Sequence, residues 1–375
     1  MSENHLHIVS FDIPYPPNYG GVIDVFYKLK MLSEKGVKIH LHCFEYPGRD
    51  RAPALEKYCE KLYYYRRKTG LFSALSIVPY IVISRRSREL IKNLANDEYP
   101  VLFEGLHSCY YLNDKRIRNK KKIYRESNIE HRYYFNLFKV SNRLLGKLYF
   151  LIESGRLLWY QRILKHSNLI LAVSQSDADY LQRVFPENKV IHLPSFHANN
   201  EINVLPGKGE YALYHGNIEV PENYHAVRFL VREIFNDLDI PLVIAGMKPP
   251  EHIKKLIAGL PNTKLISNPD DEELFDLIKN AQINILVTFQ ATGLKLKLLN
   301  TLYNGRFNIV NSEMVEGTPL TEICMVATTV NTLKEAINSC KNIEITSNSL
   351  NKRKQILESY YSNNSNIEKL ISLVF

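Results

Sequence analysis

Short apolar runs rich in β-branched and aromatic residues alternate with helical runs along the whole chain, and this alternation constrains the fold more than any other feature. Such alternation is typical of parallel sheets whose strands are joined by helices. A polar segment containing Pro and Gly, residues 195–210, separates two such series. The sequence therefore predicts an α/β protein with two doubly wound, Rossmann-like domains that face a central cleft. The predicted strands are residues 6–11, 37–44, 61–65, 100–105, 121–126, 169–174 and 189–193, then 211–216, 241–246, 263–267, 283–289 and 307–312.

Length and cysteine usage limit the class of protein. At 375 residues the chain is long enough for two domains with separate cores. Its five cysteines are scattered and never form C-x-x-C, which is typical of reduced thiols in a cytosolic protein and not of a disulfide framework or zinc module. The first residues lack the pattern of a secretion signal, and the longest apolar run, residues 71–83, has only 13 residues. We therefore expect a cytoplasmic protein.

The charge is concentrated in the first half of the chain. Residues 1–200 hold 31 Lys and Arg against 19 Asp and Glu, a net charge of +12, whereas residues 201–375 hold 17 against 20, a net charge of −3. This asymmetry indicates that one domain faces an anionic surface or substrate, such as nucleic acid or membrane phosphate. A solvated basic surface is the plainer alternative. Because no nucleic-acid motif is recognisable, we expect no nucleic-acid partner.

A strand, a turn and a lysine-bearing helix follow one another near residue 290. The apolar run 283–289 is followed by Thr292-Gly293, and the next helical run carries Lys295 and Lys297 in its first turns. A helix N-terminus presents free N–H groups and a partial positive charge, and a glycine lets a ligand approach the backbone closely. The segment therefore predicts a diphosphate site, and solvated lysines are the alternative.

Two other patterns each leave a structural and a functional interpretation open. His5 with His7, and His40 with His42, each lie two apart on predicted strands, which places each pair on one face. Because no carboxylate lies at comparable spacing, core or edge histidines are favoured over a metal site. Residues 71–94 carry Arg85, Arg86 and Arg88 beside apolar residues, which is typical of a peripheral membrane helix or of an ordinary helix packed on the sheet.

Five segments, taken in order, resemble those of one enzyme family. They are PYPPNYGG (14–21), RESNIEHRYY (125–134), LAVSQSDADYL (171–181), YHGNIEVPENYHA (214–226) and TGLKLKLLNTLYNG (292–305). The second is similar to R-x-H-N-x-E-H-x-Y-Y, and the last to G-x-[RK]-x-K-x-L-E-A-x-x-x-G. Together they resemble the GT-B fold glycosyltransferases, most closely the retaining, nucleotide-sugar-dependent enzymes of family 4 (glycosyl transferases group 1).

The resemblance implies a function and a division of labour. It implies a hexosyltransferase-type enzyme of polysaccharide biosynthesis that moves a sugar from a nucleotide-sugar donor to a hydroxyl of a glycan or lipid-linked acceptor, with retention and without a metal or other cofactor. The implied limits are 1–195 for an acceptor-side domain, 196–208 for a linker, 209–350 for the nucleotide-sugar domain and 351–375 for helices that return to the first domain. An anionic membrane surface is a further expected partner, with the enzyme peripheral at the inner face.

The same resemblance implies the site residues. The donor side would consist of Gly20, Gly21, Gly216, Asn217, Gly246, Asn268, Thr292, Gly293, Lys295, Lys297 and Asn300. The catalytic candidates are His107, Glu126 and His131, with Glu130 on the same acceptor side. His107 ends a predicted strand, where it could act on a sugar hydroxyl as an acid or base, or could instead cap or pack against a helix. His131 could contact the substrate or stack on Tyr133 or Tyr134. No metal ligands are expected.

Several positions depart from the family pattern. Thr292 and Asn300 stand where many relatives have glutamates, Asn217 and Asn223 replace an Arg and a Lys, and Ser127 replaces the motif histidine. Lys295 and Lys297 would supply the missing positive charge, since two phosphates require compensation. The departures also fit an alternative, a GT-B scaffold or binding protein that has lost catalysis.

Overall fold

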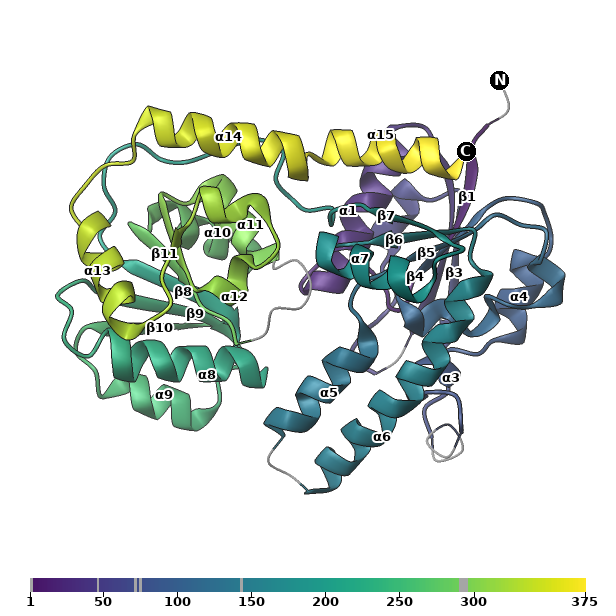
Figure 1. Cartoon of the computed structure of the whole chain (residues 1–375), viewed down its shortest axis with the longest axis horizontal. Helices are drawn as coiled ribbons and strands as arrows, with labels where there is room; N and C mark the ends of the chain where they lie inside the picture. The colour runs from purple at the N-terminus through teal and green to yellow at the C-terminus, as the bar shows by residue number, and fades with distance from the viewer. Residues whose placement is uncertain (1–2, 46, 71–72, 74–75, 142–143, 290–295) are drawn as a thin grey trace. The chain divides into compact units, whose positions relative to one another are not determined.

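The computed structural model describes residues 3–45, 47–70, 73, 76–141, 144–289 and 296–375, and it divides into two compact units (Figure 1). Unit 1 consists of residues 3–197 and 363–375, and unit 2 of residues 198–289 and 296–362. Each unit contains one sheet. The predicted domain limits at residues 195, 208 and 350 stay predictions.

Unit 1 is built on a seven-stranded parallel sheet in the order β3-β2-β1-β4-β5-β6-β7. The strands are β1 His5–Val9, β2 Lys38–Glu45, β3 Lys61–Arg66, β4 Val101–Glu104, β5 Lys122–Arg125, β6 Leu169–Ala172 and β7 Lys189–His192. The α-helices are α1 Gly20–Glu34, α3 Tyr80–Ile83, α4 Arg88–Leu94, α5 Glu130–Val140, α6 Leu144–Tyr160, α7 Gln175–Val184 and α15 Asn363–Val374. Short 3₁₀ helices lie at Pro53–Tyr58, Leu106–Tyr111, Lys115–Ile117 and Gln161–His166.

Unit 2 is built on a six-stranded parallel sheet in the order β10-β9-β8-β11-β12-β13. The strands are β8 Ala212–Asn217, β9 Leu242–Met247, β10 Thr263–Ser267, β11 Ile283–Leu286, β12 Phe307–Val310 and β13 Met325–Val326. The α-helices are α8 Pro221–Phe229, α9 Glu251–Ala258, α10 Asp271–Asn280, α11 Leu296–Asn304, α12 Ser312–Val315, α13 Val330–Cys340 and α14 Ser347–Tyr361. A π-helical turn at Leu230–Ile234 extends α8, and a 3₁₀ helix lies at Pro319–Glu322.

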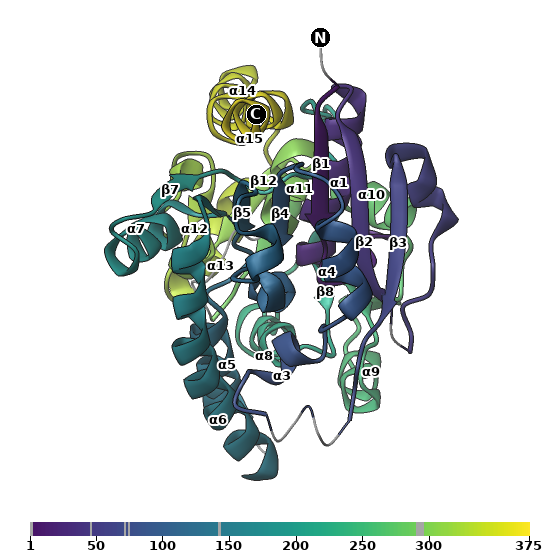
Figure 2. The ribbon, with the colours of Figure 1, turned by 90° about the vertical axis from the view of Figure 1, so that its right-hand side faces the viewer.

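The fold class predicted from the sequence is confirmed: the protein is α/β, with two doubly wound parallel sheets. All twelve predicted strands are present, with ends that differ by no more than three residues. Strand β13 was missed because two residues are too few to show a period. Helices cover both faces of the first sheet (Figures 1 and 2), so successive residues of the central strands β1 and β4 are buried on both faces.

A buried ion network connects α1 to the sheet of unit 1. Asp24 on α1 lies 3.1 Å from Arg125 and 3.0 Å from Lys28, and Lys28 Nζ lies 2.8 Å from Glu104. Asp24 Oδ1 also accepts a hydrogen bond from the backbone N–H of Phe196 at 2.7 Å. Burial alone would raise the pKa of Asp24, but Arg125 and Lys28 lower that pKa to about 2, so the carboxylate stays charged in the core.

The four strand histidines form a packed cluster in β1 and β2. His5 Nδ1 lies 3.0 Å from His40 Nε2, and His7 Nδ1 lies 2.8 Å from His42 Nε2. Asp97, which sequence spacing did not reveal, lies 3.0 Å from His7 Nε2. Burial lowers the pKa of His7 to about 4. Across the described part of the chain, no group of three or more His, Cys, Asp or Glu is placed to hold a metal ion.

The basic segment around residue 85 lies between the short helices α3 and α4, and both helices pack on the core. Helix α4 buries Leu90, Ile91 and Leu94 in the core. The Arg85 side chain is also buried, and its Nε donates to the carbonyl of Phe11 at 2.7 Å. Among the residues that the structure describes, no helix is long and apolar enough to cross a membrane.

Asp24→Ala should destabilise the protein by about 3–5 kcal/mol, because it leaves Arg125 and Lys28 as buried charges without their shared partner. Glu368→Ala is the matched control, since Glu368 pairs with Lys35 at 3.2 Å on an exposed surface, where such pairs contribute about 0–1 kcal/mol. Urea unfolding of both variants measures the difference. Equal losses in the two variants would show that the buried network is dispensable.

Candidate functional site

Each sheet has a point where the strand order reverses, between β1 and β4 in unit 1 and between β8 and β11 in unit 2. In doubly wound sheets, ligands bind beyond the carboxyl ends of the strands at such points. Most of the predicted site residues lie there. Each unit therefore has its own group of predicted site residues.

In unit 1, His107 and Glu130 lie together. His107 belongs to the 3₁₀ helix that follows β4, and Glu130 begins α5 after β5. His107 Nδ1 lies 3.8 Å from Glu130 Oε1, too far for a hydrogen bond. Both atoms are buried, and neither finds a hydrogen-bond partner among the residues that the structure describes. The His107 side chain as a whole is 19% exposed, so the imidazole is also accessible from outside.

Burial makes this pair electrically neutral near pH 7. It lowers the pKa of His107 well below its usual value, and the charges of Arg85 and Arg67 lower it further. Burial raises the pKa of Glu130 to about 8, although Arg85 and a hydrogen bond from Ser127 act in the opposite direction. The pair therefore presents a neutral imidazole beside a protonated carboxyl, which can exchange protons and hydrogen bonds with a hydroxyl.

Glycines make this region compact. Gly105, between β4 and His107, has a φ of +66°, a left-handed conformation that favours glycine. A Cβ there would lie 3.1 Å from His107 Nδ1 and 3.2 Å from Ser127 Oγ. At Gly21 a Cβ would lie 2.6 Å from the Phe11 ring, so this glycine allows α1 to approach the end of β1. A Cβ at Gly20 would meet nothing within 4 Å.

The other two catalytic candidates face different surroundings from His107. Glu126 is fully buried, and its Oε2 accepts a hydrogen bond from the Val173 N–H at 3.0 Å. Burial, together with nearby Asp177, raises the pKa of Glu126 well above its usual value. His131 lies against Tyr180, with ring centroids 5.9 Å apart, and burial lowers its pKa to about 4.

In unit 2, Lys297 faces the loop that follows β8. Its Nζ donates to Asn223 Oδ1 at 3.1 Å and lies 5.2 Å from the centre of the Tyr214 ring. Asn223 in turn donates to the carbonyl of Asn217 at 2.9 Å and accepts from the Tyr214 hydroxyl at 3.1 Å. A Cβ at Gly216 would lie 3.1 Å from the Asn223 amide. Lys297, Gly216 and Asn217, predicted as donor residues from distant segments, are therefore brought together through Asn223.

The Lys297 charge affects a buried histidine in the same place. Burial lowers the pKa of His215 to about 3, and Lys297 contributes to that decrease. His215 Nε2 is buried and has no hydrogen-bond partner in the described part of the chain. The site therefore combines a cationic lysine with a neutral imidazole.

Gly246 lies near the end of β9, which pairs with β8, and Asn268 directly follows β10, the neighbour of β9. A Cβ at Gly246 would lie 2.1 Å from Ile218 Cδ1, so this glycine leaves room for a core side chain. Asn268 has a φ of +54°, and its Oδ1 accepts from the Lys248 N–H at 2.7 Å. Both residues shape the edge of the site, Gly246 through packing and Asn268 through a turn.

Asn300 has a different set of neighbours from Lys297. Its Oδ1 accepts a hydrogen bond from Asn199 Nδ2 at 2.8 Å, and its carbonyl accepts one from Asn304 at 2.9 Å. Asn304 also donates to Asn199 Oδ1 at 2.8 Å. This asparagine group joins α11 to the chain segment at the start of unit 2. Three predicted donor residues, Thr292, Gly293 and Lys295, lie outside the described residues.

Sequence reasoning missed two residues beside this site, Glu222 and Thr288. Glu222 is in the first turn of α8 and accepts a hydrogen bond from the hydroxyl of Thr288, which follows β11. Acidic residues are common in first turns, where they favour the helix dipole, so Glu222 carried no distinguishing signal. Its proximity to Thr288 depends on the adjacency of β8 and β11 in the sheet.

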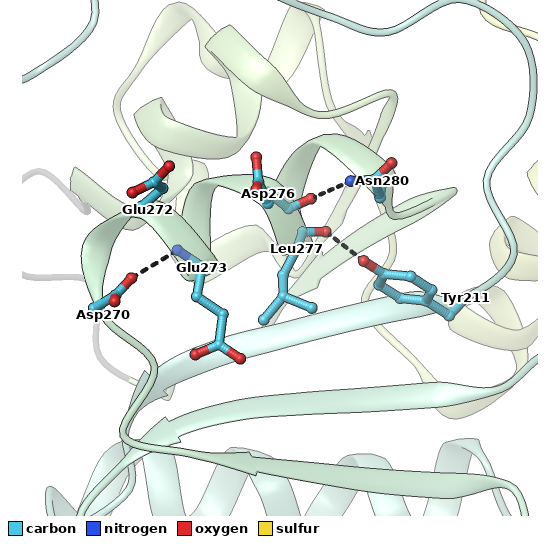
Figure 3. A pocket seen from close by; sticks show the side chains of 7 residues that line it. All are labelled: Tyr211, Asp270, Glu272, Glu273, Asp276, Leu277 and Asn280. Atoms are coloured by element: carbon cyan, nitrogen blue, oxygen red, sulfur yellow. Dashed lines mark hydrogen bonds between the residues drawn. The ribbon is translucent and has the colours of Figure 1, made fainter.

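Two pockets lie elsewhere on the units. The one along α10 is lined by Tyr211, Asp270, Glu272, Glu273, Asp276, Leu277 and Asn280 (Figure 3). Asp270 caps the helix at the Glu273 N–H, and Tyr211 donates to the carbonyl of Leu277, so the polar groups there support the helix itself. We assign it no ligand. The other pocket, in unit 1, is basic and is lined by Lys68, Arg86, Arg88, Tyr110 and Tyr111.

Comparison by sequence finds one curated relative and no family. No protein-family profile matches the chain. A protein of Klebsiella pneumoniae, described as "Uncharacterized 44.6 kDa protein in cps region", is 28% identical over 363 residues, covering 90% of this chain and 91% of that one.

Comparison by structure identifies the fold. TarM superposes with a TM-score of 0.69 at 11% identity, covering 100% of this chain and 99% of that one. HepE from Anabaena, determined in complex with UDP and glucose, has a TM-score of 0.66 at 9% identity, with 99% of each chain covered. A glycosyltransferase from Rickettsia africae has a TM-score of 0.63 at 12% identity, covering 100% and 98%. The chain has the GT-B fold of these glycosyltransferases; at such identities the similarity establishes the fold alone.

The Glu130 carboxyl predicts a specific pH dependence of stability. Its pKa is about 8 in the folded protein and 4.5 ordinarily, so folding takes up a proton between these two pH values. The free energy of unfolding of the parent protein therefore falls as the pH rises from about 4.5 to 8. Glu130→Gln cannot ionise. We expect its free energy of unfolding, relative to the parent, to increase by about 3–5 kcal/mol across that window.

Denaturant unfolding at pH 5 and pH 8 measures this change. Glu272→Gln, on the exposed surface of α10, is the control, and its difference from the parent should be the same at both pH values. If Glu130→Gln also keeps a constant difference, Glu130 is ionised in the folded protein at neutral pH.

Proposed function

We propose that this chain is a family 4-like, hexosyltransferase-type glycosyltransferase that transfers a sugar from a nucleotide-sugar donor to a hydroxyl of a glycan or lipid-linked acceptor. The observation that carries the proposal is the position of Lys297, held by Asn223 at the loop after β8. A lysine beside a glycine loop and a helix N-terminus is well suited to a diphosphate. The HepE structure, determined with UDP and glucose in a chain of the same fold, supports a nucleotide sugar as the donor.

The donor side would stabilise the leaving group. As the bond between the sugar carbon and the diphosphate oxygen breaks, negative charge develops on the diphosphate. This charge would be offset without a metal by Lys297, by Lys295 and by the backbone N–H groups near Gly216 and α11. Asn217 and Asn223 stand at positions where many members of the resembled family have an Arg and a Lys. Lys297 donates a hydrogen bond to Asn223, so its charge lies at one of these two positions. The lysine is therefore close enough to replace the missing charge.

The acceptor side would handle a neutral hydroxyl. A bond forms between the acceptor oxygen and the sugar carbon on the face from which the diphosphate departs, and the acceptor proton passes to the departing phosphate oxygen. Configuration is then retained without a protein nucleophile. The neutral His107 and protonated Glu130 would orient the incoming sugar or hydroxyl by hydrogen bonds, since neither adds a charge that must be desolvated.

We place this activity in polysaccharide biosynthesis, in the cytoplasm at the inner face of the membrane. The location of the Klebsiella relative in a cps region supports the pathway, and the net charge of +12 on residues 1–200 supports an anionic membrane surface as a partner. The second candidate is a binding protein that retains the nucleotide site without turnover. The hydrogen bond between Asn300 and Asn199 favours it, because it engages the amide oxygen that stands at a glutamate position of many relatives.

Lys297→Ala should weaken the binding of a nucleoside diphosphate by roughly tenfold to a hundredfold, because one charge-assisted contact with the diphosphate is lost. Isothermal titration calorimetry with UDP and with ADP measures this loss and identifies the preferred base. Lys255→Ala, on the exposed side of α9, is the matched control and should bind like the parent. Lys295→Ala should behave like Lys297→Ala. Unchanged binding in both lysine variants would mean that the diphosphate site lies elsewhere.

His107→Ala should lower turnover by about a hundredfold or more while leaving nucleoside diphosphate affinity unchanged, because an orienting and proton-exchanging group is removed from unit 1 alone. A radiolabelled-sugar transfer assay in EDTA, with NMR of the product anomer, tests turnover, metal independence and retention together. The turnover of His131→Ala in the same assay shows whether the second predicted histidine also contributes to catalysis. A parent protein that binds the nucleotide tightly but transfers no sugar to any glycan or lipid acceptor would favour the binding protein.

A further inference from the structure

Helix α6 exposes a row of large apolar residues on one side, where an ordinary surface helix exposes polar ones. Its buried residues are Glu153, Ser154, Leu157 and Tyr160. Its exposed residues include eight large apolar ones, with exposed fractions from 41% to 85%: Leu144, Leu145, Leu148, Tyr149, Leu151, Ile152, Leu158 and Trp159. These positions recur at intervals of three and four and therefore form one continuous stripe along the helix.

Polar contacts fix the helix in this orientation. Glu153 Oε2 accepts a hydrogen bond from the backbone N–H of Tyr80, at the start of α3, at 2.8 Å. Ser154 Oγ donates to the carbonyl of His131 at 2.8 Å. A rotation of α6 that buried its outward-facing leucines would expose Glu153 and Ser154 and break both hydrogen bonds. The outward apolar stripe is thus specified by the inward polar contacts.

Helix α5 completes a two-helix projection, which we call the α5–α6 hairpin. The two helices pack side by side and run out from the sheet of unit 1 (Figures 1 and 2). Tyr134 of α5 packs edge-on against Phe150 of α6, with ring centroids 6.0 Å apart. Phe135 of α5 adds another exposed aromatic side chain. An apolar stripe of this extent on a folded protein marks an interaction surface.

The charges around the stripe have one sign. The two acidic residues between 130 and 165, Glu130 and Glu153, are both buried, so the described hairpin surface carries no exposed carboxylate. The basic residues of the same region that the structure describes are Arg132, Lys139, Lys147, Arg156, Arg162 and Lys165. An apolar stripe of Leu, Ile, Tyr and Trp flanked only by Lys and Arg matches an anionic lipid surface, with acyl chains for the stripe and phosphate headgroups for the cations.

We propose that the α5–α6 hairpin is a membrane-docking surface that inserts its outward stripe into the interface of an anionic bilayer. A second copy of the chain fits this surface less well, because pairing two hairpins would bring their cations together. The proposal gives a location to the membrane contact of the proposed function. That location is the α5–α6 hairpin and not α4, whose Leu90, Ile91 and Leu94 are buried in the core. It does not depend on catalysis.

The protein carries its own reporter for this contact. Trp159 is the single tryptophan of the chain and is 50% exposed on the stripe. On addition of vesicles of phosphatidylglycerol and phosphatidylcholine to the full-length protein, Trp159 emission should shift to shorter wavelength and become protected from iodide quenching. Pure phosphatidylcholine vesicles should give a much weaker response. High salt should reduce binding to the anionic vesicles, because it screens the headgroup attraction.

Two double variants separate the two components of binding. Leu145→Gln with Leu148→Gln should lower vesicle affinity by roughly tenfold to a hundredfold, because two large side chains no longer enter the interface. Lys139→Gln with Lys147→Gln should lower affinity for anionic vesicles only and reduce the salt dependence. Ile343→Gln with Tyr360→Gln, two exposed apolar residues of unit 2, is the matched control and should bind vesicles like the parent.

Three results would overturn the proposal. In the first, the protein cosediments with vesicles while Trp159 emission stays unchanged. In the second, the emission shifts with protein concentration in the absence of lipid, which reports self-association. In the third, the leucine variant binds vesicles as well as the parent does. Calorimetry with UDP on the same samples keeps this test apart from the transferase proposal. A protein that binds UDP but not vesicles contradicts the docking surface alone.

Discussion

The buried contact between Asp24 and Arg125 is the interaction on which the geometry of unit 1 depends. Asp24 lies on α1 and Arg125 at the end of β5, so the pair joins the first helix to the middle of the sheet. Arg125 also donates to the carbonyls of Leu193 and Pro194, which holds the segment after β7 against the same charged group. Two buried charges persist there because each satisfies the other and the surrounding backbone. The arginine of the RESNIEHRYY segment is therefore structural, and the residues after it are placed by it.

The predicted site residues of the two units differ in their electrostatics. In unit 1, burial leaves His107 uncharged and Glu130 protonated near neutral pH, whereas in unit 2 the ammonium of Lys297 is held at the loop after β8. In the proposed reaction, charge develops on a diphosphate and a hydroxyl attacks without first becoming an anion, and a cation in unit 2 with a neutral pair in unit 1 would suit both requirements. Burial of His107 and Glu130 is tolerated because neither side chain carries a charge that would have to be desolvated.

Two helices of unit 1 show how similar sequences are used in opposite ways. Both α4 and α6 combine leucines with basic residues, and from sequence α4 and its flanking arginines were the more obvious membrane segment. In the structure α4 buries Leu90, Ile91 and Leu94, while α6 exposes Leu144, Leu145 and Leu148. The difference is set by single polar contacts, such as the hydrogen bond from the Tyr80 N–H to Glu153, which no periodicity of hydrophobic residues predicts.

The sequence by itself determined the class of fold and the edge of each sheet at which a site would lie. Apolar runs and the turns between them identified twelve of the thirteen strands that the structure describes. Parallel connection places the carboxyl ends of the strands of one sheet on the same edge, where Lys297 contacts Asn223 in the first turn of α8, the helix that follows β8. Only the tertiary structure decided the partners: Asn223 for Lys297, Glu130 and not Glu126 for His107, Asn199 for Asn300, and the core for Arg85. Local sequence patterns indicate which face of a helix or strand is apolar. Which polar groups become hydrogen-bond partners depends on distances of a few ångströms between segments far apart in the chain. Those distances are set by the packing of the core.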